Sequence, residues 1–289
     1  MRIGLQVPSF TFPGGSERIA PEFARIVRDA DQGGLDSLWV MDHLFQIHSV
    51  GPAEDPMLEG YSALAYAAAL TEHITLGTMV TGVSYRAPSL LIKTVTTLDV
   101  LSGGRAWLGV GAAWNDEEAR GLGLHFPPTA ERFELLEDTL RLAHQMWKGD
   151  EAAFEGTRIS AERPLNSPQS VRRPHPPILV GGMGEKKTLR FVAKYADACN
   201  IFDGDQLPHK LSVLREHCER EGRDYAEIEK TALTILPDGG SASQAVDAAG
   251  RLAEAGVDHV IFSQRPGTAI ASVLAEARSE VEKLVPAGR

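Results

Sequence analysis

The sequence has few cysteines, and this scarcity bears on both disulfides and metals. The two cysteines, Cys199 and Cys218, are too few for a disulfide framework and lack the short spacing of metal ligands. His43 and His48 lie five residues apart without a cluster of cysteine, histidine or carboxylate around them. We therefore expect reduced thiols, a cytoplasmic protein and no metal site.

Long apolar runs and excess positive charge are also missing. No window reaches the roughly 18 apolar residues of a membrane span. One basic residue precedes the apolar run Ile3–Val7, which does not fit a signal peptide. The formal net charge of −10 argues against a nucleic-acid partner, although it leaves room for local anion pockets. A small-molecule substrate is the expected partner, with neither nucleic acid nor membrane.

What the sequence does contain is a regular alternation of strand-like and helix-like segments over its 289 residues. Eight such units in series favour a closed (β/α)₈ TIM barrel over an open sheet. The exception is the proline-rich stretch 148–177, which we interpret as an insertion between helix 4 and strand 5 of a single domain, 1–289. The expected strands are 3–7, 35–40, 74–80, 106–110, 178–180, 198–202, 228–236 and 259–263, and the expected helices are 17–32, 62–70, 88–101, 130–147, 185–195, 208–221, 242–254 and 268–285.

In such a barrel the active site lies at the carboxyl ends of the strands. The residues that follow the predicted strands are rich in glycine and aromatic side chains, with one histidine. This composition suits a flat, partly apolar ring. No Gly-x-Ser-x-Gly elbow and no Gly-x-x-x-x-Gly-Lys-Ser/Thr loop occurs.

Two of these segments carry chemistry. An imidazole can give or take a proton near neutral pH, so His43 could transfer a proton beside a reacting ring, or it could simply hold a loop by a hydrogen bond. The glycines of Gly181–Gly184 precede a predicted helix, where backbone amides can hold a phosphate, although tight turn geometry is the other reading. Both alternatives stay open from the residues alone.

A third segment, Ser102–Glu118, begins like a dinucleotide fingerprint. Gly109 and Gly111 give Gly-x-Gly, but Trp114 occupies the place of the third glycine, and no acidic residue ends a strand about 20 residues on. We therefore interpret this run as the fourth strand and its exit. The other tryptophans, at positions 39, 107 and 147, are expected in the core.

Four segments together resemble the bacterial luciferase-like superfamily of flavin- and deazaflavin-dependent oxidoreductases. The resemblance runs from residue 1 to about 280 and is strongest to the branch that uses coenzyme F420. The matching segments are Trp39–His43, Leu76–Val80 with Tyr85–Pro88, Leu101–Arg105 through Gly109–Asn115, and Pro176–Gly182.

The resemblance implies F420 as cofactor, with FMN as the alternative, and a homodimer. It implies a bulge after strand 3 with a non-prolyl cis peptide at Met79–Val80. It also implies His43 as the catalytic proton-transfer residue. The implied cofactor-binding residues are Asp42, His43, Met79, Val80, Gly111, Asn115, Gly181, Gly182, Met183 and Gly184, and the expected substrate pocket is Phe10, Phe12, Phe45, Tyr85 and Trp114.

The expected reaction is hydride transfer between F420 and a small organic substrate. The alternatives are a reduced-FMN monooxygenase on the same fold and a barrel lyase or isomerase that binds a substrate phosphate. Many such lyases need a lysine at a strand end, and none is found. Members that act on sugar phosphates carry a glutamate near Ala113–Trp114, and its absence here favours a more apolar substrate.

Overall fold

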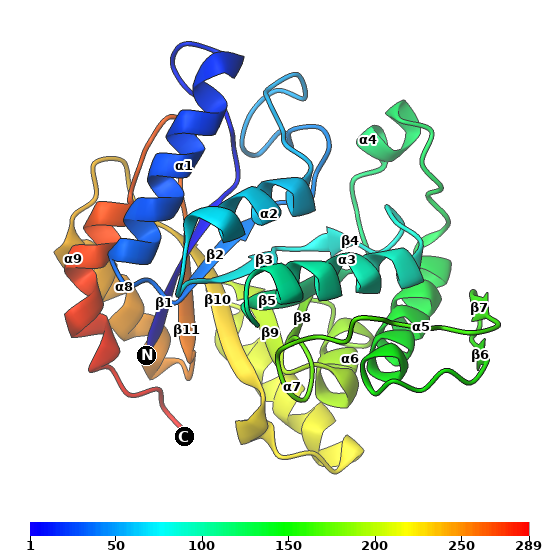
Figure 1. Ribbon diagram of the computed structural model, residues 1–289. Helices are drawn as coiled ribbons and strands as arrows, with labels where there is room; N and C mark the ends of the chain where they lie inside the picture. Colours follow the sequence, from blue (N-terminus) through cyan, green and yellow to red (C-terminus); the bar gives the residue numbers. More distant parts are fainter. Residues whose placement is uncertain (289) are drawn as a thin grey trace.

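The fold is a closed ring of parallel strands, seen in a computed structural model that describes residues 1–288. The strand order is β3-β2-β1-β11-β10-β9-β8-β5-β4, and a further pairing of β3 with β5 closes the ring (Figure 1). The predicted TIM barrel is thus confirmed. Its strands are β1 (Arg2–Val7), β2 (Ser37–Val40), β3 (Thr75–Thr78), β4 (Thr81–Gly82), β5 (Ala106–Gly111), β8 (Ile178–Gly181), β9 (Ala198–Phe202), β10 (Glu229–Ile235) and β11 (His259–Ser263).

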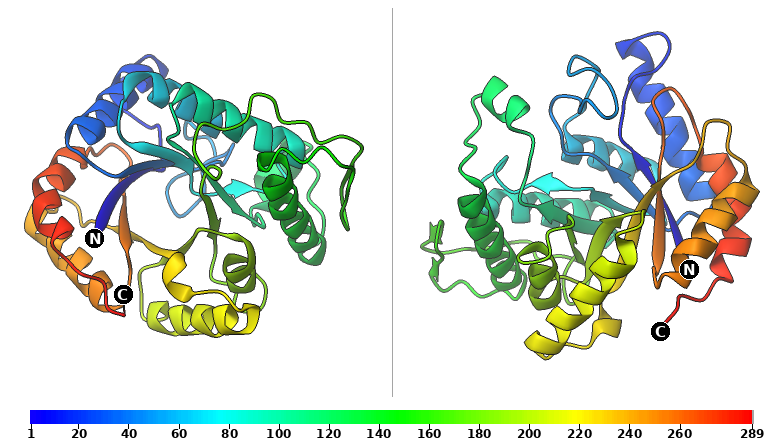
Figure 2. Two further views of the ribbon diagram at one scale, coloured as in Figure 1. Left: turned by 60° about the horizontal axis from the view of Figure 1, so that its bottom comes forward. Right: turned by 180° about the vertical axis from the view of Figure 1, so that it is seen from behind.

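Helices surround this ring (Figure 2). They cover it because they have apolar faces to bury. In the first helix this face includes Phe23, Ile26 and Val27, which are buried against the barrel. The helices are α1 (Ser16–Gln32), α2 (Gly60–Leu70), α3 (Pro88–Leu101), α4 (Asp116–Gly121), α5 (Thr129–Trp147), α6 (Thr188–Tyr195), α7 (Leu207–Glu221), α8 (Ala242–Glu254) and α9 (Ala271–Glu282), with a short 3₁₀ turn at Tyr225–Glu227.

Three helix predictions need correction. Helix α4 was not predicted, because its six residues are mostly polar and too short to show a period. Helix α6 begins at Thr188 rather than at residue 185, since residues 185–187 form a turn after the glycines. Helix α9 covers Ala271–Glu282 and is shorter at both ends than the predicted 268–285.

Aromatic side chains fill the interior of the barrel. Trp39 and Trp107 meet edge to face with ring centroids 5.7 Å apart, and Leu179 and Ile261 pack with them. Trp147 is also buried, outside the ring on α5. The prediction that these three tryptophans belong to the core is confirmed.

The third strand is interrupted at the mouth of the barrel. The predicted continuous strand 74–80 is wrong, because β3 ends at Thr78 and a cis peptide joins Met79 to Val80 before β4 resumes the pairing with β5. The bulge and the cis bond that the resemblance implies are both present. Neighbouring Gly109 has no room for a side chain, since a Cβ there would lie 1.8 Å from the Thr78 carbonyl oxygen.

Residues 148–177 lie between α5 and β8 and include a two-stranded antiparallel ribbon, β6 (Phe154–Glu155) with β7 (Ser160–Ala161). Two buried carboxylates fasten this segment to the helices. Asp138 on α5 accepts the backbone N–H of Arg158 at 2.6 Å, and Asp99 on α3 accepts that of Val171 at 2.7 Å. That this segment is an insertion into the barrel stays a prediction.

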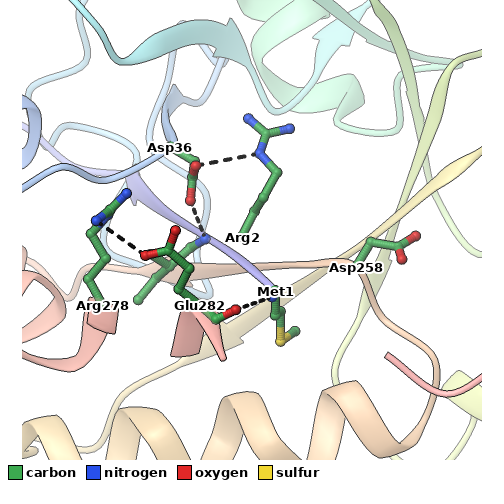
Figure 3. Close-up of a pocket in the computed structure, with 7 residues that line it drawn as sticks. Met1, Arg2, Asp36, Asp258, Arg278 and Glu282 are labelled. Carbon is green, nitrogen blue, oxygen red and sulfur yellow. Dashed lines mark hydrogen bonds and ion pairs between the residues drawn. The ribbon is translucent and has the colours of Figure 1, made fainter. Parts of the chain in front are cut away.

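Ion pairs close the amino end of the barrel, around a hollow of about 230 Å³ (Figure 3). Arg2 reaches Asp36 at 3.7 Å and Glu229 at 2.8 Å, and Arg278 reaches Glu282 at 3.5 Å. At this end of a barrel such contacts serve stability rather than chemistry.

Two sequence features can be followed in the structure. Cys199 and Cys218 are both buried and free of disulfides. Over residues 1–288 the structure has no helix with both the length and the apolar character needed to cross a membrane.

Candidate active site

A cavity of about 930 Å³ opens at the carboxyl ends of the barrel strands. The loop after β2 and helix α4 project from this same end (Figures 1 and 2). Residues from most of the barrel strands and their loops contribute to the wall, so the cavity is a property of the closed ring. Such a concave, mainly apolar space is the usual form of a small-molecule site.

His43 stands on the wall of this cavity and pairs with a buried glutamate. Its Nδ1 lies 2.5 Å from Oε1 of Glu118, on α4. The side chain of His43 is 14% exposed, whereas that of Glu118 is wholly buried. The imidazole is therefore held from behind, with its other edge on the cavity side.

Glu118 accepts further hydrogen bonds from three groups. The Tyr85 hydroxyl donates to Oε1 at 2.5 Å, and the backbone N–H groups of Leu44 and Phe45 donate to Oε2 at 2.6 and 3.1 Å. Burial raises the pKa of Glu118, but the hydrogen bonds from His43 and Tyr85 outweigh burial and lower it below its ordinary value. The carboxylate is thus ionised near neutrality. Burial, and next the bond to Glu118, raise the pKa of the Tyr85 hydroxyl.

Trp114 covers His43 at the mouth of the cavity. The two rings meet edge to face with centroids 5.4 Å apart, and Trp114 is 55% exposed. The preceding residue, Ala113, has φ of 60°, a left-handed conformation that residues other than glycine seldom adopt. Such backbone strain is often found at functional sites.

Asp42, a predicted cofactor residue, lies in a buried ion pair rather than on the cavity wall. Both terminal nitrogens of Arg86 donate to its carboxylate, at 2.5 and 2.9 Å, and Arg86 also pairs with Glu59. The guanidinium lies over the Tyr61 ring, 4.8 Å from its centroid. Burial lowers the pKa of Arg86, but its hydrogen bonds and ion pair with Asp42 have the larger effect. The net pKa of Arg86 is therefore raised above its ordinary value. This pair fixes the backbone that leads into His43.

The bulge forms part of the cavity wall. A Cβ on Gly181 would lie 2.8 Å from Cγ1 of Val80, and one on Gly111 would lie 3.1 Å from Cγ2 of Val80. Gln6 donates from Nε2 to the carbonyl of Met79 at 3.4 Å. The two glycines therefore give Val80 room inside the ring.

The glycine turn after β8 lies at the same end of the ring. Gly181, Gly182 and Gly184 line the cavity, as does Thr188, the first residue of α6. The Gly182 N–H already donates to the Asn200 carbonyl at 3.3 Å. The start of α6 and its threonine hydroxyl can receive a phosphate, as helix amino ends commonly do.

The structure brings most of the predicted site residues to the cavity wall. It does not place Asp42, Asn115, Met183, Phe10, Phe12 or Phe45 there. The predicted residues that line the cavity are His43, Met79, Val80, Tyr85, Gly111, Trp114, Gly181, Gly182 and Gly184.

The prediction of Phe10 and Phe12 as pocket residues is corrected. Phe10 is fully buried and meets Phe23 of α1 edge to face at 5.3 Å, and Phe12 belongs to the same core. Phe45 packs close to Gly121 of α4. An apolar ring after a strand can line a cavity or pack against a neighbouring helix, and Phe10 and Phe45 do the latter.

Several wall residues were missed by the sequence analysis. Asn200 and Thr234 come from β9 and β10, each within two residues of the end of its strand. The strand-end rule had the means to find them, because each lies at or near the end of a predicted strand. Glu118 had a weaker signal, since it closes an acidic run that looks like solvent-facing surface. Within residues 1–288 no three histidine, cysteine or carboxylate side chains converge as a metal site.

The sequence profile described as Luciferase-like monooxygenase matches residues 1–280. The chain is also 32% identical over 232 residues to an F420-dependent glucose-6-phosphate dehydrogenase of Kineococcus radiotolerans, a match that covers 76% of this chain and 65% of that protein. An uncharacterized protein of Mycobacterium tuberculosis is 31% identical over 206 residues, covering 71% of this chain and 69% of the relative. The chain thus spans slightly less than two thirds of the length of that dehydrogenase.

Solved structures share the fold at lower identity. An F420-dependent secondary alcohol dehydrogenase in complex with an F420–acetone adduct superimposes with a TM-score of 0.81 at 17% identity, over 97% of this chain and 98% of the other. The long-chain alkane monooxygenase LadA gives 0.83 at 15% identity, over 100% and 93%.

Proposed function

Because this chain belongs to the luciferase-like monooxygenase family, we propose that it is an oxidoreductase that transfers a hydride between coenzyme F420 and a small, uncharged organic substrate. The observation that carries the proposal is His43 on the cavity wall, held by Glu118 and facing a space bounded by glycines and a backbone bulge. The F420-dependent relatives support the choice of cofactor.

The residues present fit a deazaflavin. Val80 of the bulge, seated over Gly111 and Gly181, offers a smooth support for a flat ring system. Gly182, Gly184 and Thr188 would hold the phosphate of its side chain at the start of α6. When bound, this cofactor would accept or donate a hydride at C5 of its ring.

His43 would handle the proton that accompanies the hydride. In alcohol oxidation the O–H proton passes to Nε2 of His43 as the carbinol carbon loses its hydride, and in ketone reduction both transfers reverse. General acid–base help of this kind contributes roughly 10²- to 10⁴-fold to a rate. Trp114 and Ile47, on the wall beside His43, would exclude water and orient the substrate.

The wall of the cavity favours a neutral substrate. Among the described residues that line it, Asp203 is the only acidic one and neither lysine nor arginine occurs. A sugar phosphate would need a second phosphate site besides the glycine turn that holds the cofactor. Apolar side chains instead make up much of the wall, among them Ile47, Val50, Trp114 and Phe133. An alcohol or ketone with an apolar body satisfies both the imidazole and these side chains.

Purified protein titrated separately with F420 and with FMN, followed by absorbance, tests the choice of cofactor. We expect F420 to bind and to be reduced by simple secondary alcohols but not by glucose 6-phosphate. Binding of FMN without F420 would overturn the proposal. Oxygen uptake coupled to substrate oxidation would then favour the reduced-FMN monooxygenase.

The homodimer that the resemblance implies is part of this proposal. Light scattering after size-exclusion chromatography measures the mass in solution directly. A mass equal to one chain at all concentrations would remove it.

A further inference from the structure

We propose that Glu118 is a positioning residue that fixes both the orientation and the tautomer of His43, so that the imidazole presents an unprotonated Nε2 to the cavity. The tautomer follows from the hydrogen bonds alone, whereas its catalytic consequence rests on the proposed function. Glu118 itself does not line the cavity and acts only through His43.

The first step of the argument is a count of donors. Two backbone N–H groups, from Leu44 and Phe45, converge on Oε2, and they can only donate. The Tyr85 hydroxyl and Nδ1 of His43 share Oε1. An ionised carboxylate offers about four acceptor positions, and four donors fill them. In this arrangement the hydrogen between His43 and Glu118 belongs to Nδ1.

The second step is the consequence for the other ring nitrogen. A neutral imidazole carries one N–H, so a hydrogen on Nδ1 leaves Nε2 with a free lone pair. Rotation of the ring by half a turn would set a C–H against the buried carboxylate, which the charge of Glu118 opposes. Trp114, edge to face with His43, restricts the ring from the mouth of the cavity. Nε2 is therefore a proton acceptor suited to a hydroxyl group.

The third step is the cost of burying this charge. An ionised carboxylate removed from water is unfavourable by several kcal/mol unless hydrogen bonds replace its hydration. In the acidic run of α4, the neighbouring Glu117 is exposed to solvent. Glu118 is instead wholly buried against His43. After proton uptake the same charge stabilises the imidazolium, as the aspartate does in a Ser-His-Asp triad.

Nitrogen-15 NMR of the full chain, with histidine alone labelled, tests this inference. The chain has nine histidines, and His43→Gln identifies the signals of His43 by their loss. At about pH 8, where an ordinary imidazole is neutral, we expect Nδ1 of His43 to show the shift of a protonated nitrogen and Nε2 that of an unprotonated one. Protonated Nε2 in the wild type would overturn the inference, and this result requires no variant of Glu118.

The variants separate positioning from simple structural support. A glutamine in Glu118→Gln has one acceptor oxygen and one NH₂ group, so it cannot accept from all four donors. We expect it to lose the Nδ1–H preference, and Glu118→Asp to retain it in part. Glu117→Gln removes the same charge one residue away and should leave the His43 signals unchanged. Unchanged signals in Glu118→Gln would contradict a positioning role.

Kinetics provide the arm that depends on the proposed function. Glu118→Gln should lower kcat for alcohol oxidation by about 10²-fold, within the range of general acid–base catalysis, with little change in KM or in F420 affinity. An equal loss in Glu117→Gln, or a loss confined to KM, would count against it. If the wild type does not turn over F420 at all, the proposed function fails while the NMR result still decides the tautomer.

Discussion

A methyl group on Gly109 would lie 1.8 Å from the carbonyl oxygen of Thr78, where only a shift of backbone can relieve the clash. We predict that Gly109→Ala destabilises the chain by several kcal/mol, comparable to the worst core substitutions. Urea unfolding measures the difference. Gly250, inside α8 with nothing within 4 Å of an added Cβ, is the control. Its alanine variant should gain about 0.5–1 kcal/mol from helix propensity, and a similar effect at both positions would contradict the packing argument.

Trp114 supports a second prediction at this scale. Its ring contacts His43 edge to face, and in the proposed function it belongs to the substrate pocket rather than to the cofactor site. Trp114→Ala should lower kcat/KM for the organic substrate about 10-fold, equivalent to about 1.4 kcal/mol, and leave the Kd for F420 within about 2-fold. Trp114→Phe should restore most of the loss. A parallel weakening of F420 binding would show that the indole belongs to the cofactor site.

Single residues also mark what the sequence could and could not predict. His43, Tyr85 and the glycines were found because the strand-end rule depends on fold alone. Glu118 was missed because its partners come from residues 43–45 and 85, which no local pattern connects to α4. Phe10 was assigned to the pocket because an aromatic residue after a strand suits either a ligand or a core. The choice depended on Phe23, a residue of the next helix.

Among the secondary-structure elements, Asp31 on α1 joins that helix to the entry of β3. Its carboxylate accepts the backbone N–H groups of Glu72, His73 and Ile74 at 3.1, 3.0 and 2.8 Å. Burial raises the pKa of Asp31, but these hydrogen bonds bring the net value below its ordinary one. We predict that Asp31→Ala lowers the free energy of unfolding by about 2–3 kcal/mol, since three amides lose a charged acceptor.

Asp29 provides the control for that measurement. It lies two residues earlier on α1 and forms a half-exposed ion pair with Arg25 at 3.1 Å. Its alanine variant should cost at most about 0.5 kcal/mol in the same urea titration, because exposed ion pairs contribute little. Equal losses for the two aspartates would show that general charge on α1, rather than the three amides, is responsible.

The elements themselves were predicted where periodicity is long and strong, as in α1, α3 and α5. Prediction failed at short or irregular pieces. Helix α4 has six residues and no apolar stripe to mark it, and β3 is divided from β4 by a cis bond that the residues alone do not signal. The start of α6 was misplaced because the turn 185–187 contains good helix formers. Tertiary contacts, rather than the local sequence, determine helix α4, the break between β3 and β4, and the start of α6.

At the scale of the whole molecule, a partly buried network of polar side chains joins the first strand to the last. Arg2 on β1 and His259 on β11 both reach Glu229 on β10, at 2.8 and 2.9 Å, and His259 also lies 2.9 Å from the Ser37 hydroxyl on β2. Burial raises the pKa of Glu229, but the bond to His259 and the charge of Arg2 lower it to about 2, against 4.5 ordinarily. These contacts join β1, β2, β10 and β11, so they link the two ends of the sequence where the first and last strands of the barrel meet.

A pH dependence follows with a definite sign. Because its folded-state pKa is lowered, ionised Glu229 stabilises the fold above its ordinary pKa, and this contribution disappears as the pH falls from about 4.5 towards 2. It amounts to about 3 kcal/mol, at about 1.4 kcal/mol per pKa unit. The unfolding free energy of wild type minus that of Glu229→Gln should shrink through this window. Glu227→Gln, on an exposed side chain, should follow the wild type, and a constant difference for Glu229→Gln would refute the assignment.

The barrel as a whole was predictable because eight strand–helix units in series leave few other ways to cover both faces of a parallel sheet. The seam was not. Strand β1 pairs with β11 from Arg2 opposite His259 to Gln6 opposite Ser263, a register that joins residues more than 250 positions apart. Hydrophobic alternation alone does not set such a register, and polar contacts such as that of Glu229 with His259 help to fix it.

The four tryptophans differ in exposure, so their fluorescence can report on the cavity without an added label. Three indoles are almost inaccessible, at 1%, 5% and 5% exposure for Trp39, Trp107 and Trp147, whereas Trp114 is 55% exposed at the cavity mouth. Acrylamide or iodide should therefore quench essentially one emitter. A molecule that enters the cavity should shield that emitter and shift its emission to shorter wavelength. Unlabelled compounds can thus be screened for entry by their own protection of Trp114, before any reaction or cofactor is known.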